Sequence, residues 1–154
     1  MSEIRDIWVY AHNILRSSRL LINQELASLD LSSAEGNILF HLTTQGDGLR
    51  QEQIVEQIDI SKPAVSRAVR SLEEKGFVVR RKDPDDRRAS QVLLTAKARE
   101  IGSQIEQVYN DVFAIATQAA SEEEIRHFIA LFGRVSASYS AAWTQKSKHE
   151  EDPC

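Results

Sequence analysis

Residues 61–88 read SKPAVSRAVRSLEEKGFVVRRKDPDDRR, which predicts a helix followed by a charged hairpin. Ser61 is a good N-cap because its hydroxyl can accept a hydrogen bond from a backbone N–H that has no helical partner. Pro63 is tolerated in the same turn because a backbone N–H at that position would have no helical partner, so its absence loses no hydrogen bond. Gly76 favours the left-handed conformation that ends a helix, and Lys75 places a favourable charge in the last turn. The pattern therefore predicts a helix that begins at Ser61 and stops at Gly76.

The predicted helix has two faces. Its apolar residues recur at three- and four-residue spacing and predict the buried face, which consists of Val65, Ala68, Val69 and Leu72. The opposite face is polar and basic and carries Lys62, Ser66, Arg67 and Arg70. One face is thus expected to pack on a core while the other stays available to a partner.

The hairpin and the residues before the helix complete a recognisable arrangement. Residues 77–79 and 92–94 read as strands, and residues 83–88 form a charged turn between them. Leu49 is a candidate third strand, and residues 51–58 read as a preceding helix joined to the next by a tight link at 59–60. This order is typical of a winged helix-turn-helix, whose recognition helix lies in the major groove and whose wing reaches the minor groove.

Two motifs carry a family resemblance. Residues 86–95 fit the pattern D-x-R-x-x-x-V-x-L-T, and Leu72-Glu73-Glu74-Lys75-Gly76 fits a recognition-helix ending. On these motifs the chain resembles the MarR family of bacterial transcription regulators over nearly its whole length. The resemblance implies a mainly α fold, in which a winged helix-turn-helix core with a small β-hairpin wing is flanked by long N- and C-terminal dimerisation helices.

The length of 154 residues, with 42% hydrophobic and 27% charged residues, predicts one globular domain spanning 1–154. Helical periodicity predicts dimerisation helices at 3–29 and 95–145, a DNA-binding lobe at 32–94 and a frayed tail at 146–154. Caps support these bounds: Ser32 with Glu35 and Ser121 with Glu124 form capping boxes, and Thr95 caps a further helix.

The long helices have apolar faces that a compact winged core cannot cover. A two-fold homodimer with intertwined first and last helices is the economical solution, and the resembled family forms such dimers. The alternative is a four-helix packing within one chain. A dimer also suits DNA, because two recognition helices on a two-fold axis would read half-sites about 34 Å apart.

The net charge of −4 is unevenly divided along the chain. Residues 61–88 carry nine Lys or Arg and five Asp or Glu, a local charge of +4, which leaves −8 for the remainder. Local potential attracts phosphate, and the acidic remainder keeps other surfaces away from DNA. A protein of negative net charge is therefore compatible with DNA binding.

The expected DNA contacts lie in the helix and the wing: Ser61, Lys62, Ala64, Ser66, Arg67, Arg70, Arg81, Lys82, Arg87 and Arg88. Ser61 and Lys62 suit phosphate, whereas either Arg67 or Arg70 suits guanine. The resemblance implies that Asp86 pairs with an arginine to brace the wing while another arginine enters the minor groove. The alternative is a solvated helix face beside a loop whose charges neutralise one another.

Nothing in the sequence indicates catalysis, a cofactor or a metal. The four histidines lack metal-ligand spacing, the only cysteine is Cys154, and no nucleophile elbow or phosphate-binding glycine loop occurs. We expect no enzyme activity. The absence of a long apolar run and of a signal pattern predicts a cytoplasmic protein without a membrane span.

The expected function is that of a homodimeric regulator of a palindromic operator in double-stranded DNA, most simply a repressor. The resembled family often binds small aromatic or phenolic anions between its dimer helices and DNA-binding lobe. This implies an effector site, for which the candidates on the first helix are Trp8, His12, Arg16 and Arg19. Core or dimer packing is the alternative for such aromatic residues. A winged-helix module that binds protein and not DNA is the rival function.

Overall fold

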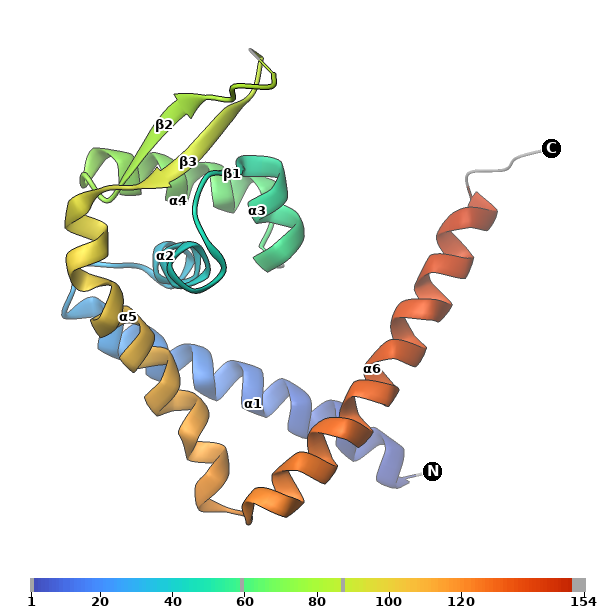
Figure 1. The fold of residues 1–154 in the computed structure, drawn as a ribbon. Coiled ribbons are helices and arrows are strands. Elements are labelled where there is room, and N and C mark those ends of the chain that lie inside the picture. Colours follow the sequence, from blue (N-terminus) through green and yellow to red (C-terminus); the bar gives the residue numbers. More distant parts are fainter. Residues whose placement is uncertain (1, 59, 87, 151–154) are drawn as a thin grey trace. The chain divides into compact units, whose positions relative to one another are not determined.

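The computed structural model describes residues 2–58, 60–86 and 88–150. They form, in chain order, α1 (Ser2–Ala27), α2 (Ser33–Gln45), β1 (Leu49–Arg50), α3 (Gln51–Ile58), α4 (Lys62–Glu74), β2 (Val78–Lys82), β3 (Ser90–Leu94), α5 (Ala96–Ala114), the short 3-10 helix η1 (Ile115–Gln118) and α6 (Glu122–Glu150) (Figure 1). The elements group into two compact units, one ending at Phe113 and the other beginning at Ala114.

The first unit contains a three-stranded antiparallel sheet in the order β1-β3-β2. Leu49 of β1 pairs with Val92 of β3, so the short third strand predicted at Leu49 is confirmed. Val78 of β2 pairs with Leu94, and Lys82 pairs with Ser90 at the far end of the hairpin. Figure 1 shows this hairpin projecting beyond α3 and α4 as a wing.

The helices α2, α3 and α4 pack against one another beside the sheet. The four apolar residues predicted to form the inner face of α4 are all buried: Val65, Ala68, Val69 and Leu72. They join one hydrophobic core with residues from α1, α2, α3, the sheet and α5, which include Leu26, Ile38, Leu39, Leu42, Ile54, Val78, Val92 and Ile105. The winged helix-turn-helix core expected from the sequence is confirmed.

The predicted caps fix the helix starts around this core. Ser32 and Glu35 form the capping box: the Glu35 amide donates to Ser32 Oγ at 3.3 Å, and the Ser32 amide donates to Glu35 Oε2 at 2.7 Å. Thr95 Oγ1 accepts from the Ala98 amide at 3.3 Å at the start of α5. The helix α1 ends at Ala27, slightly before the predicted residue 29, and a turn leads to Asp30.

Much of α1 lacks a covering partner within the first unit. Large apolar side chains such as Ile4, Leu15 and Leu20 are more than half exposed. A side chain of that kind in water forfeits about 1.5–3 kcal/mol of burial free energy, so a row of them indicates a surface that another partner covers.

The second unit consists of η1 and α6. Ser121 caps α6 as predicted, because its amide donates to Glu124 Oε2 at 2.8 Å and its hydroxyl accepts from the Glu124 amide at 3.4 Å. The helix continues to Glu150, beyond the predicted end at about residue 145, so residues 146–150, which were assigned to the tail, are helical. Unbroken helix propensity from residue 134 onward explains the difference, since no Gly or Pro occurs there before Pro153. Cys154 lies outside the described residues.

Among the helices that the structure describes, none is long and apolar enough to cross a membrane.

Candidate nucleic-acid interface

The outer face of α4 gathers the residues that the sequence singled out. Lys62, Ser66, Arg67 and Arg70 are exposed, Ala64 is half-buried, and Ser61 lies at the N-cap, where its hydroxyl accepts from the Ala64 amide at 3.4 Å. The buried residues at 65, 68, 69 and 72 hold this face outward. The helix therefore presents two guanidinium groups and a positively polarised N-terminus to solvent.

The two arginines of α4 differ in their surroundings. Arg70 Nε donates to Glu74 Oε1 at 3.1 Å, one turn along the same helix, and both side chains are well exposed. Arg67 has no such ion pair among the described residues. Arg70 would have to leave Glu74 to contact a base, whereas Arg67 is available at once.

The wing carries a second group of cations. Arg81 and Lys82 are exposed at the end of β2, and Arg88 is exposed in the turn. Arg80 of the same strand pairs with Glu73 of α4, with 3.8 Å between Arg80 Nε and Glu73 Oε2. Arg87 lies outside the described residues. The wing and the outer face of α4 thus both carry exposed positive charge in the first unit.

An ion pair that the sequence did not reveal anchors the turn of the wing. Asp83 is almost fully buried, its Oδ2 accepts from Arg50 Nε at 2.6 Å, and its Oδ1 accepts from the Asp85 amide at 2.8 Å. These bonds hold the pKa of Asp83 below its ordinary value, and the bond from Arg50 has the largest effect. Asp83 in turn raises the pKa of Arg50. The partners are 33 residues apart, so no local pattern could have linked them.

Among the described residues, Asp86 makes backbone hydrogen bonds in the turn of the wing. Asp86 Oδ1 accepts from the backbone amide of Arg88 at 2.9 Å, and its carbonyl accepts from the Ala89 amide at 3.0 Å. Asp86 therefore closes the turn through the backbone. Two ion pairs among the described residues tie the wing to the rest of the unit, one between Asp83 and Arg50 and one between Arg80 and Glu73.

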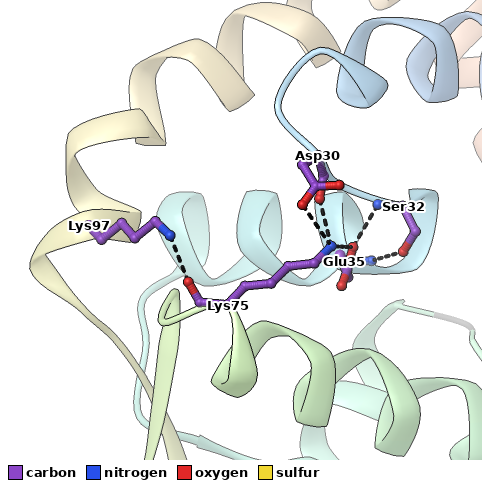
Figure 2. Close-up of polar contacts among 5 residues, drawn as sticks. All are labelled: Asp30, Ser32, Glu35, Lys75 and Lys97. Carbon is purple, nitrogen blue, oxygen red and sulfur yellow. Dashed lines mark hydrogen bonds and ion pairs between the residues drawn. The ribbon is translucent and has the colours of Figure 1, made fainter.

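A second unpredicted cluster holds the C-terminal end of α4 (Figure 2). Lys75 Nζ donates to the Asp30 carbonyl at 2.6 Å and to Glu35 Oε2 at 3.1 Å, and lies 3.9 Å from Asp30 Oδ2. On the other side, Lys97 Nζ donates to the Lys75 carbonyl at 2.7 Å. The sequence assigned Lys75 only to the helix end and Glu35 only to a cap, because a link between distant turns leaves no periodic signal.

Glu35 is buried yet remains ionised, because its carboxylate accepts several hydrogen bonds. Glu35 is only 3% exposed, and burial alone would raise its pKa. The Ser32 amide, the Ser71 hydroxyl and the Lys75 ammonium group together outweigh burial, so the pKa of Glu35 is lowered from its ordinary value. Glu35 is thus a buried carboxylate at neutral pH.

The four residues named for an effector are spread along α1. Trp8, His12, Arg16 and Arg19 are exposed. None of them lines the cavities of about 610, 570 and 380 Å³ that lie beside α4, the wing and α5. The described residues also contain no group of three His, Cys, Asp or Glu side chains that could hold a metal ion.

Comparison with known proteins gives this geometry a context. A model of the MarR family matches residues 29–89, which run from the α1–α2 turn to the turn of the wing, just before β3. The structure of the transcriptional regulator SlyA is similar over 90% of this chain and 97% of its own, with a TM-score of 0.80 and 26% identity.

Two further structures contain DNA. A Listeria monocytogenes protein described as a MarR-family transcriptional regulator, complexed with 26mer DNA, is 23% identical over 94% of this chain and 93% of its own, with a TM-score of 0.78. The S. aureus MepR–DNA complex is 24% identical over 84% of this chain and 96% of its own, with a TM-score of 0.76. At these identities the likeness concerns the fold. The winged core at residues 29–89 thus matches the model of the MarR family, and the chain has the fold of MarR-family transcription regulators.

Proposed function

We propose that the protein is a sequence-specific regulator that binds double-stranded DNA through α4 and the wing. The observation that carries the proposal is the outward basic face of α4, held by a buried apolar face, beside a wing with exposed Arg81, Lys82 and Arg88. This is the arrangement in which a helix enters the major groove while a hairpin follows the backbone or minor groove. The DNA complexes of the Listeria and S. aureus proteins support it.

The residues divide by role. Ser61 and Lys62 at the start of α4 are expected to hold a phosphate, and Arg81, Lys82, Arg87 and Arg88 to hold the backbone or minor groove. Arg67 is the preferred base reader, because no ion pair among the described residues holds its guanidinium group. Arg70 is expected to assist once the DNA displaces Glu74.

The proposed working form is a two-fold homodimer on a palindromic operator. The exposed apolar side chains of α1 and α6, such as Ile4, Leu15, Ile129 and Trp143, support a second copy as their cover. Two α4 helices related by the axis would read half-sites about one helical turn apart, and a dimer bound there would block transcription. The simplest role is therefore that of a repressor.

Relief by a small aromatic or phenolic anion completes the proposal. Arg16 and Arg19 could supply the charge for such an anion, and Trp8 and His12 its ring contacts. A ligand that binds one arrangement of the dimer better than another would change the spacing of the two α4 helices, and an operator matched to one spacing would then be lost.

The test is selection of bound duplexes from a random pool, followed by affinity measurements over a range of salt. We expect a palindromic consensus and a linear fall of log K with log salt. The Arg67→Ala variant should lose about 1–3 kcal/mol of discrimination at one base pair, and less on random duplex. Arg134→Ala on α6 removes the same charge outside the interface and is the matched control.

Three results would distinguish base reading by α4 from the alternative accounts of the protein. No duplex binding at low salt would leave a protein-interaction module as the better account of the winged core. Binding that no α4 substitution makes less selective would contradict base reading by that helix. Repeating the selection with small aromatic acids present tests relief by an effector, which predicts a weakened consensus.

A further inference from the structure

The C-terminal end of α4 is held from two sides by charged side chains. Lys75 reaches across to the turn after α1, where it donates to the Asp30 carbonyl, and to Glu35 in the first turn of α2 (Figure 2). The Lys75 carbonyl accepts from Lys97 in the first turn of α5. One residue therefore connects the ends or starts of α1, α2, α4 and α5.

We infer that Lys75 is a positioning residue for sequence reading: it sets the orientation of α4 against the α1–α2 turn and does not contact DNA. The inference rests on the proposed function, because it concerns how α4 is aligned with a duplex. It adds a role to a residue that lies outside the exposed basic face of α4.

The surroundings of Lys75 exclude the two ordinary roles of such a lysine. Its side chain is 28% exposed and its ammonium group is bonded to Asp30 and Glu35, so the charge is already neutralised and not offered to phosphate. Neither does the ammonium group cap the carbonyls of its own helix, since its hydrogen-bond acceptors among the described residues, Asp30 and Glu35, lie outside α4. Linking elements is the role that remains.

The acceptors of Lys75 are themselves fixed. Glu35 also accepts from the Ser32 amide at 2.7 Å, so the carboxylate cannot move without breaking the cap of α2. Asp30 has a φ of 56°, a left-handed conformation that glycine, asparagine and aspartate adopt more readily than other residues, and this bend follows shortly after the end of α1. A shift of the end of α1 would thus move an acceptor of Lys75.

A cavity of about 610 Å³ separates the α1–α2 turn from α4 and is lined by Asp30 and Glu35 on one side and by Arg67, Ser71 and Lys75 on the other. The polar contacts of Lys75 therefore lie along this cavity, beside the buried core residues Leu31 and Ala68.

A small rotation of α4 about its C-terminal end would displace Arg67 relative to the DNA bases. Arg67 precedes Lys75 by about 12 Å of helix, at about 1.5 Å per residue. A tilt of about 5° about the C-terminal end would move Arg67 by about 1 Å, which exceeds the range of about 0.5 Å over which hydrogen-bond lengths vary. Non-specific phosphate contacts tolerate such a shift better than paired bonds to one base.

The experiment compares Lys75→Gln with Arg99→Gln in the full-length chain. Arg99 also forms an inter-element ion pair, with Asp47 at 2.9 Å, but touches neither α4 nor its acceptors, so the control loses the same charge. Affinities for the selected duplex and for random duplex are measured over a range of salt. Amide hydrogen exchange of residues 28–36 and 70–76 is followed without DNA.

We expect Lys75→Gln to bind the selected duplex about tenfold more weakly, with unchanged affinity for random duplex and an unchanged salt slope. Exchange should quicken in both segments together. Glu35→Gln should act in the same direction, and the double variant should be no worse in selectivity than Lys75→Gln alone, because both changes break one link. Arg99→Gln should leave the selectivity unchanged.

Other outcomes overturn the inference. A salt slope reduced by about 0.9 would mark Lys75 as a phosphate contact. Faster exchange with unchanged selectivity, or no change in exchange at residues 28–36, would show that the link does not position α4. If the wild-type chain binds no duplex at low salt, the proposed function fails and this inference fails with it; loss of selectivity in the variant cannot be confused with that result.

Discussion

Glu35 shows how one buried charge depends on several neighbours. Its carboxylate is 3% exposed yet ionised, because bonds from Ser32, Ser71 and Lys75 outweigh the cost of burial. We predict that Glu35→Gln lowers the free energy of unfolding at pH 7 by about 1–3 kcal/mol, the usual cost of a buried group that loses a bonding partner. Urea unfolding of the variant and the wild type measures the difference.

The lowered pKa of Glu35 also predicts how the stability of the protein depends on pH. The pKa of Glu35 is lower in the folded chain than its ordinary value of 4.5, so its contribution to stability is present above about 4.5 and is lost as the pH falls through the folded pKa. The stability gap between wild type and Glu35→Gln should therefore narrow at acid pH. Glu100→Gln, an exposed carboxylate of α5, is the control and should change stability by less than about 0.5 kcal/mol. A gap of equal size at pH 3 and pH 7 would contradict this account.

Asp83 should matter for the wing more than for the core. It joins β2 to Arg50 and also holds the Asp85 amide, so Asp83→Asn should quicken amide exchange between residues 83 and 90 and weaken duplex binding. Exchange in α2 should stay as in the wild type, because Asp83 has no hydrogen-bond or ion-pair partner there among the described residues. Asp85→Asn, a neighbouring exposed carboxylate, is the matched control. Equal exchange rates in Asp83→Asn and wild type would show that the ion pair does not order the wing.

At the scale of elements, the sequence predicted what periodicity and caps encode. The bounds of α3 and α4, the Ser32 and Ser121 capping boxes and the short strand at Leu49 all follow from residues close together in the chain. What it missed are the contacts between elements: Arg50 with Asp83, and Lys75 with Glu35. A charge at a helix end or in a turn has many solvated alternatives, and only the fold determines which distant partner it meets.

The crossing of α1 and α2 depends on a glycine that local reasoning also missed. A Cβ at Gly36 would overlap the Leu26 side chain, which is fully buried and has little room to move. We predict that Gly36→Ala is destabilising by about 1–3 kcal/mol, the cost of overpacking a core, partly offset by the roughly 1 kcal/mol that alanine adds to a helix. Thermal unfolding followed by circular dichroism measures the change.

Gly133 is the matched control for that substitution. It lies inside α6, and a Cβ there would meet nothing within 4 Å. Within one chain, Gly133→Ala should therefore incur no overlap and should gain up to about 1 kcal/mol of helix propensity. Equal effects of the two substitutions would contradict close packing between α1 and α2.

At the scale of the whole molecule, each of the two units carries large exposed apolar side chains, on α1 in the first unit and on α6 in the second. Ile129 is 63% exposed and Trp143 is 71% exposed on α6, and Ile4 is 61% exposed on α1. Dimerisation through these faces would also supply the two-fold symmetry that a palindromic operator requires. Association and DNA selectivity should therefore weaken together.

The variant Ile129→Glu tests this coupling. A two-fold interface carries each substitution twice, so losing about 1.5 kcal/mol of apolar burial per copy amounts to roughly 3 kcal/mol, or more than a hundredfold in the dimer Kd. Sedimentation equilibrium should show the wild type as a dimer and Ile129→Glu shifted toward monomer. Ala130→Glu adds the same charge at the adjacent position, which points to a different face of α6, and should remain dimeric. The affinity of Ile129→Glu for a palindrome should fall toward its affinity for a single half-site. A wild-type chain that is monomeric would refute the coupling. So would a monomeric variant that prefers the palindrome as strongly as the wild type does.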